Sequence, residues 1–152
     1  MEFRNMTKRV LVGLGNPYMR DDGVGRVVAG EFERLSLPDL QVFQDYSPEL
    51  SWLQEFRGAS RVVLVDALMT GAPPGKVTTL RLRRQSRSLD RLPNLHSLQV
   101  HDVLDLARSV GVDVPLTLVG VEPADCSPGL GLSDVVRAAV PLIIDAARKE
   151  LM

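Results

Sequence analysis

The sequence predicts an α/β protein, a three-layer sandwich built on a mostly parallel, twisted sheet. Two observations carry this prediction. Short aliphatic runs of strand length recur along the chain, and between them apolar residues recur at the three- and four-residue spacing of a helix. Strands that alternate with helices pair in parallel, and the helices then cover the two faces of the sheet.

Five segments are expected to be strands, because they are short, aliphatic and bounded by turn residues. The clearest is "RVVLVDAL" at 61–68, a buried strand that carries a carboxylate, Asp66, near its end. The segment 76–83 alternates between apolar and polar residues, which predicts a more exposed strand near an edge of the sheet. The five expected strands are 9–14, 40–46, 61–68, 76–83 and 116–121.

Four segments have helical periodicity. Ser133 is placed to cap the last of them, and Pro141 within it is expected to kink or divide the helix, because proline lacks the backbone N–H that a helix needs. A polar, irregular stretch at 84–96 is expected to be a loop. The four expected helices are 23–35, 48–56, 98–110 and 133–151.

Composition indicates one domain, residues 1–152. A chain of 152 residues can bury a core without disulfides, and the single cysteine, Cys126, cannot form an internal one. The net charge of −1 gives no electrostatic reason to bind nucleic acid or an anionic membrane, and the apolar runs are too short to span a bilayer. We therefore expect a cytoplasmic monomer without nucleic-acid or membrane partners.

The loop after the first strand, "GLGNPYMRDDG", invites comparison with phosphate-binding loops. It lacks the third glycine of a G-x-G-x-x-G fingerprint, because Tyr18 stands there, and it lacks the Gly-Lys-Ser/Thr of a P-loop. Two carboxylates at the start of the next helix, Asp21 and Asp22, would also repel a phosphate. Nucleotide binding is therefore disfavoured.

The position of the carboxylates predicts a different kind of site. In parallel α/β sheets, ligands bind beyond the carboxyl ends of the strands near a topological switch point. Residues after the first, third and last strands should therefore converge there, namely 16–22, 66–70 and the segment from Glu122 onward. Glu122 itself either lines this crevice or stabilises the turn before Pro123.

Each candidate side chain has a structural alternative. Asp21 or Asp22 can cap the helix while the other faces the crevice, and Asp66 can accept hydrogen bonds from loop N–H groups. His96 precedes the expected helix at 98–110, whereas His101 lies within it and is expected at its surface or boundary. Asp22, Asp66 and His96 form an O,O,N set that suits a first-row divalent metal, although their spacing alone does not demand one.

Several longer motifs resemble those of a known family. The stretches "VLVGLGNPYMRDDGVG", "VVLVDALMTGAPPGKV", "LHSLQVHDVLDLAR" and "LTLVGVEPADCSPGLGLSDVV" occur in the order and spacing of the hydrogenase maturation proteases, and they span nearly the whole chain. These proteases are nickel-dependent endopeptidases that trim the C-terminus of the [NiFe]-hydrogenase large subunit. The resemblance implies a phosphorylase/hydrolase-like α/β fold.

The resemblance also implies roles for three residues. Asp22, Asp66 and His96 match the family's metal-contacting positions, although some members have Glu where this chain has Asp22. Asp21 is then the better helix cap. Asp22 and Asp66 are the candidate catalytic residues, and nickel is expected to arrive with the large-subunit precursor rather than to be held permanently. The 85–95 loop is the expected substrate-docking segment.

Two alternatives to this function remain open. A non-catalytic module that inspects nickel would need the same ligands as the protease. A peptidyl-tRNA hydrolase-like enzyme shares the opening Gly-Leu-Gly-Asn-Pro, but its catalytic histidine is missing from "MRDDGVG" here. Cys126 has no evident base nearby in the sequence, which disfavours a thiol nucleophile.

Overall fold

A computed structural model describes residues 8–46, 52–82, 111 and 114–152 of the chain. Its strands form one five-stranded sheet in the order β2-β1-β3-β5-β4. The first four pair in parallel, and β4 runs antiparallel to β5 at one edge. The mostly parallel α/β prediction is therefore confirmed, including the edge position of the fourth strand. The strands are β1 (Arg9–Leu14), β2 (Leu40–Asp45), β3 (Arg61–Ala67), β4 (Val77–Leu82) and β5 (Leu116–Val121).

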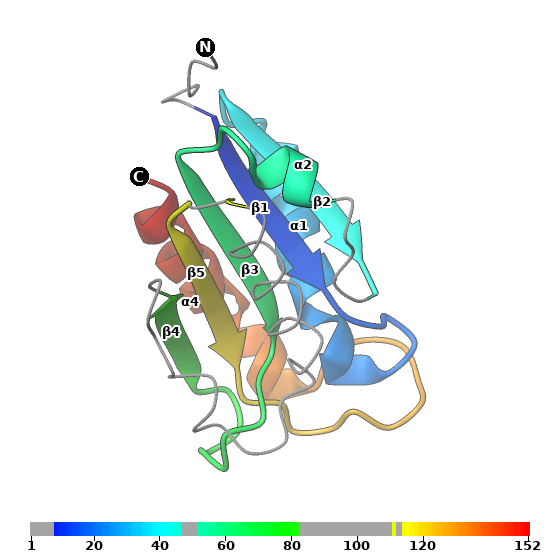
Figure 1. The fold of residues 1–152 in the computed structure, drawn as a ribbon. Coiled ribbons are helices and arrows are strands. Elements are labelled where there is room, and N and C mark those ends of the chain that lie inside the picture. The colour runs from blue at the N-terminus through cyan, green and yellow to red at the C-terminus, as the bar shows by residue number, and fades with distance from the viewer. Residues whose placement is uncertain (1–7, 47–51, 83–110, 112–113) are drawn as a thin grey trace.

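The helices lie on both faces of this sheet, which gives the three expected layers (Figure 1). Helices α1 and α4 cover one face, and the short helix α2 covers the other. The described helical elements are the 3₁₀ turn η1 (Arg20–Gly23), α1 (Val24–Leu35), α2 (Trp52–Phe56) and α4 (Asp134–Leu151). The expected helix at 98–110, the loop at 84–96 and the first part of the 48–56 helix lie outside the described residues.

The period of two along the strands divides the core between the two faces. In β1, Val10 and Val12 contact the cluster that contains Trp52 and Phe56 of α2. Leu11, between them, points to the opposite cluster under α1 and α4. The same alternation continues along β3, so both faces of the central strands are buried, as parallel sheets require.

Helix α4 excludes one of the two effects expected of Pro141, because the proline does not divide the helix. Ser133 accepts a hydrogen bond from the Val136 amide and caps the helix as predicted, and the helix then continues to Leu151. Its buried stripe remains in phase on both sides of the proline, with Ala139 before it and Ile143 after it. Burying this stripe offsets the roughly 3 kcal/mol that an interior proline costs. Among the described residues, no helix is long and apolar enough to cross a membrane.

Candidate active site at the carboxyl ends of two central strands

The strand order places a switch point between β1 and β3. Strand β1 leads through α1 to β2 on one side, and β3 then pairs with β1 on the other side. Gly13 of β1 is in register with Val65 of β3, so the residues just beyond these two positions leave the sheet side by side. Crevices that form where strand order reverses are the usual ligand sites of such sheets.

Two glycines bring the start of η1 and α1 against the ends of the strands. Gly15 has a φ of +129°, a conformation that side chains disfavour, and a Cβ there would overlap the carbonyl of Asp22. Gly25 approaches β1 and β3 so closely that a Cβ would overlap the carbonyl oxygens of Leu14 and Val65. The absence of both side chains therefore sets the position of Asp22.

Backbone hydrogen bonding fixes Asp22 from the turn after β1. The Asn16 amide donates to Asp22 Oδ2 at 2.9 Å, and the Asn16 side chain in turn accepts a hydrogen bond from the Tyr18 amide at 2.9 Å. Asn16 thus organises the loop that carries Asp22. The hydrogen bond orients Asp22, and within the described part of the chain Oδ1 receives no protein donor.

Asp66 lies at the end of β3, within electrostatic range of Asp22. Its Oδ1 accepts a hydrogen bond from the Ala67 amide at 2.8 Å. Burial, reinforced by the negative charge of Asp22, raises the pKa of Asp66 from 3.8 to about 8. The structure therefore brings the two carboxylates within electrostatic range, as the sequence predicted, and a proton or a bound cation would relieve their repulsion.

Asp21 does not cap its own helix, which corrects the role expected for it. The carboxylate is fully buried and crosses to the loop between β5 and α4. Its Oδ2 accepts hydrogen bonds from the amides of Ala124 and Asp125, both at 2.9 Å, and from Ser133 Oγ at 2.8 Å, while Oδ1 accepts from the Ser133 amide at 2.7 Å. Neither η1 nor α1 has a side-chain cap.

These hydrogen bonds also set the charge of Asp21. Burial by itself would raise the pKa, but the donors, led by the Ser133 amide, outweigh it and hold the pKa of Asp21 below its ordinary value. The residue stays ionised and ties η1 to the loop at 122–133, which runs beside η1 at the lower edge of the sheet in Figure 1. Sequence reasoning missed this role because the partners lie more than a hundred residues away.

Glu122 fixes the loop that follows β3. Its carboxylate accepts hydrogen bonds from the Thr70 amide at 2.8 Å, Thr70 Oγ1 at 3.0 Å and the Gly71 amide at 3.1 Å. Both of its oxygens are thus used to fix the loop after β3. Neither of the roles expected for Glu122 anticipated this contact, which depends on the neighbouring positions of β3 and β5.

Cys126 lies within electrostatic range of Asp21 and Asp22, although it is far from them in the sequence. Burial, followed by the negative charges of Asp22, Asp21 and Asp125, raises the pKa of its thiol to about 11. The thiol therefore remains protonated at neutral pH and is a poor nucleophile, as expected.

The third predicted metal-contacting residue, His96, lies outside the described residues. Within the described ranges, no group of three His, Cys, Asp or Glu side chains is placed to hold a metal ion. The pair Asp22 and Asp66 nevertheless suits a divalent cation. A backbone N–H orients one oxygen of each carboxylate, and the positive charge of a cation would relieve the repulsion between the two side chains.

Comparisons with known proteins agree with the sequence motifs. Residues 47–150 match the model of a family described as hydrogenase maturation protease. The hydrogenase 2 maturation protease of Escherichia coli is 30% identical over 138 residues, covering 87% of this chain and 84% of that protein.

Solved structures share the fold. The hydrogenase maturating endopeptidase HybD from Escherichia coli superposes with a TM-score of 0.82 at 23% identity, covering 92% of this chain and 89% of that one. A hydrogenase 2 maturation peptidase from a Thaumarchaeota archaeon has a TM-score of 0.72 at 28% identity, with coverages of 95% and 97%.

Proposed function

The chain belongs to the hydrogenase maturation protease family and is a peptidase, and we propose that it removes the C-terminal extension of a [NiFe]-hydrogenase large-subunit precursor after nickel has been inserted. The observation that carries the proposal is the carboxylate pair Asp22 and Asp66 at the switch point of the sheet. Family membership favours this function over a peptidyl-tRNA hydrolase-like enzyme.

In this proposal, nickel is part of the substrate. Asp22, Asp66 and His96 contact the nickel ion that the precursor carries, and the precursor's own ligands complete its coordination. The nickel ion, as a Lewis acid, polarises the groups bound to it. Because the contact forms only with a loaded precursor, cleavage would depend on successful nickel insertion.

The two carboxylates have different parts in the hydrolysis. Asp22, oriented by the Asn16 amide, supplies the negative charge that helps to raise the pKa of Asp66. Without a cation, Asp66 is largely protonated at neutral pH, and the positive charge of the substrate's nickel would lower its pKa. The ionised carboxylate could then accept a proton from the attacking water and return it to the leaving amine. We therefore assign proton transfer to Asp66 and the orientation of the substrate's metal to Asp22.

The test is to incubate the protein with nickel-loaded and nickel-free precursor and to read the C-terminus by mass spectrometry. We expect cleavage of the loaded precursor only, and its loss in Asp22→Asn, Asp66→Asn and His96→Ala. His101→Ala serves as the matched control for the histidine and should cleave normally.

The possible outcomes separate the hypotheses. Unchanged cleavage in all three variants would overturn the site assignment. Equal cleavage of loaded and nickel-free precursor would overturn nickel recognition. Binding of a verified cognate precursor without cleavage would instead favour a non-catalytic nickel checkpoint.

A further inference from the structure

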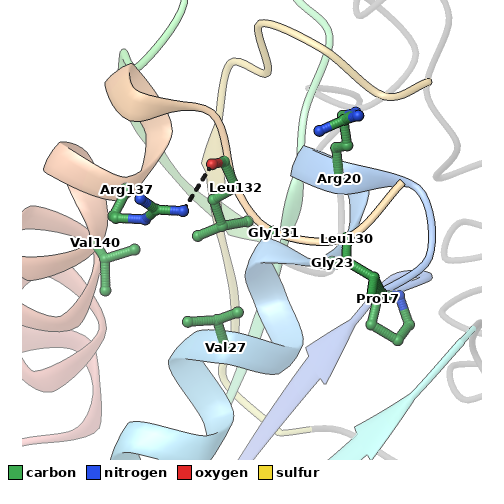
Figure 2. Close-up of a pocket in the computed structure, with 9 residues that line it drawn as sticks. All are labelled: Pro17, Arg20, Gly23, Val27, Leu130, Gly131, Leu132, Arg137 and Val140. Atoms are coloured by element: carbon green, nitrogen blue, oxygen red, sulfur yellow. Dashed lines mark hydrogen bonds between the residues drawn. The ribbon is translucent and has the colours of Figure 1, made fainter. Parts of the chain in front are cut away.

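An apolar hollow of about 530 Å³ lies between α1, α4 and the loop that precedes α4 (Figure 2). It adjoins the candidate active site along the chain. Pro17 at its rim follows Asn16, which orients Asp22, and Gly23 at its rim follows Asp22 directly. A ligand in the hollow would therefore lie next to the turn that carries Asp22.

The apolar lining of the hollow includes side chains that remain unusually exposed. Leu130 is 72% exposed and Val27 is 42% exposed, and Leu132 and Val140 face them from the loop and from α4. Several apolar side chains that line one hollow are typical of an interaction site, whereas a singly exposed residue such as Leu142 is not.

Among the residues that the structure describes, two charged side chains line the hollow, and both are arginines. Arg20 comes from η1 and Arg137 from α4, on opposite sides of the hollow (Figure 2). Each has a nearby carboxylate, but the ion pairs are long, at 3.7 Å from Arg20 Nε to Asp125 and 4.0 Å from Arg137 Nη1 to Asp134. Such exposed pairs are weak, and a guanidinium has five donors, so both arginines can bind an additional anion.

The backbone holds Arg20 in place rather than leaving it as a free surface side chain. Arg20 has a φ of +46°, and its amide donates to the Gly129 carbonyl at 3.1 Å, while the Gly129 amide donates to the Tyr18 carbonyl at 2.8 Å. The guanidinium packs on Gly129, where a Cβ would come within 2.6 Å of Arg20 Cζ. This packing leaves the guanidinium at the rim of the hollow.

We propose that the hollow binds the end of the precursor's C-terminal extension, with apolar side chains against Val27 and Leu130 and the terminal carboxylate on Arg137, while Arg20 adds positive charge at the opposite rim. The inference rests on the proposed function. The end of a chain always carries an α-carboxylate, whatever its side chains are, and guanidinium groups bind carboxylates through paired N–H donors. An apolar surface flanked by two cations complements an apolar segment that ends in an anion.

The test measures binding directly and without nickel. A peptide with the sequence of the cognate extension, labelled at its N-terminus, is titrated with protein and followed by fluorescence anisotropy. We expect Leu130→Ser and Arg137→Gln each to weaken binding by about fivefold or more, and a C-terminally amidated peptide to bind similarly weakly. The matched controls are Leu142→Ser and Arg148→Gln, exposed residues of α4 outside the hollow, and they should bind as the parent does.

Several results would overturn the inference: absence of binding to the parent protein, equal binding by the hollow variants and their controls, or equal binding of free acid and amide. Sedimentation that shows a dimer lost in Leu130→Ser would assign the hollow to a second copy of the chain instead. The binding assay needs no cleavage, so the two proposals can fail separately. If the precursor is cut but the peptide does not bind, only this inference is overturned. If the peptide binds as expected but the precursor is not cut, only the proposed function is overturned.

Discussion

Asp66 gains a proton when the chain folds, and this makes stability depend on pH. The unfolded carboxyl ionises near pH 3.8, whereas the folded one holds its proton until about pH 8. The folded state therefore binds more protons between these values, and the free energy of unfolding should fall as pH rises from about 4 to about 8. At about 1.4 kcal/mol per pKa unit, the total loss is on the order of a few kcal/mol.

Asp66→Asn removes this titration while it keeps the shape of the side chain. We expect the variant to match the parent near pH 4 and to exceed its free energy of unfolding near pH 9, because the parent must then hold a buried, ionised Asp66 that Asp22 repels. Urea unfolding in the presence of a metal chelator, repeated across this pH range, measures the difference. Parallel pH profiles for the two proteins would contradict the shifted pKa.

Asp21 should contribute more to stability than any surface carboxylate, because it is buried and accepts four hydrogen bonds from the loop before α4. In Asp21→Asn, an NH₂ group must face N–H or O–H donors, so we expect a loss of about 2–4 kcal/mol in the free energy of unfolding. The matched control is Asp134→Asn, an exposed carboxylate of α4, which should change stability by less than about 0.5 kcal/mol.

The pH dependence gives an independent check on Asp21. Since its folded pKa lies below 3.8, its contribution is fully present above that value and is lost as pH falls through the folded pKa. The difference in the free energy of unfolding between the parent and Asp21→Asn, measured by chemical unfolding, should therefore be constant from neutral pH to about 5. It should become smaller only in stronger acid. A gap that persists unchanged in strong acid would show that packing, rather than charge, is responsible.

At the scale of elements, the approach of α1 to the sheet determines where the site lies. Gly13 and Gly25 face each other across the contact, and a Cβ on Gly13 would overlap the Gly25 carbonyl. Gly25→Ala should therefore push α1 away from β1 and β3, with a loss of about 1–3 kcal/mol in unfolding free energy and reduced precursor cleavage as Asp22 moves.

Gly30→Ala provides the control on the same helix. A Cβ at Gly30 meets only the end of Gln44 at 3.9 Å, so alanine fits and should stabilise the helix by roughly 0.5–1 kcal/mol. Thermal unfolding and cleavage assays of both variants test the pair. If Gly25→Ala proved as stable and active as Gly30→Ala, close packing of α1 would not position the site.

Sequence patterns identified the elements well where local periodicity reflects burial. β1, β3 and β5 each carry an aliphatic run that the sheet buries on both faces, so their positions follow from the local sequence pattern. The continuity of α4 did not follow, because the local effect of Pro141 was outweighed by packing of the helix against the sheet. That balance depends on tertiary contacts that a window of sequence does not contain.

At the scale of the whole molecule, topology explains which site residues were predictable. Asp22 and Asp66 follow neighbouring parallel strands, so the rule for switch points places them together. The contacts of Asp21 with Ser133 and of Glu122 with Thr70 join loops that are far apart in sequence, and no local pattern indicates them. The catalytic and metal-contacting roles of Asp22, Asp66 and His96 stay predictions.

The origin of the nickel is also a property of the whole complex, and it leads to a last prediction. Asp22 and Asp66 offer oxygen ligands and His96 offers one imidazole nitrogen, so the predicted ligand set contains no thiolate. The protein alone should therefore bind nickel weakly. A resident ion at a hundred times its Kd would stabilise the fold by about 2.7 kcal/mol and raise Tm by roughly 5–11 °C. We expect equimolar nickel to give a much smaller shift in a thermal melt, while pull-down of nickel-loaded precursor succeeds with the parent and fails with Asp22→Asn. A full-sized shift in the parent that disappears in Asp22→Asn would show instead that the protein holds its own nickel.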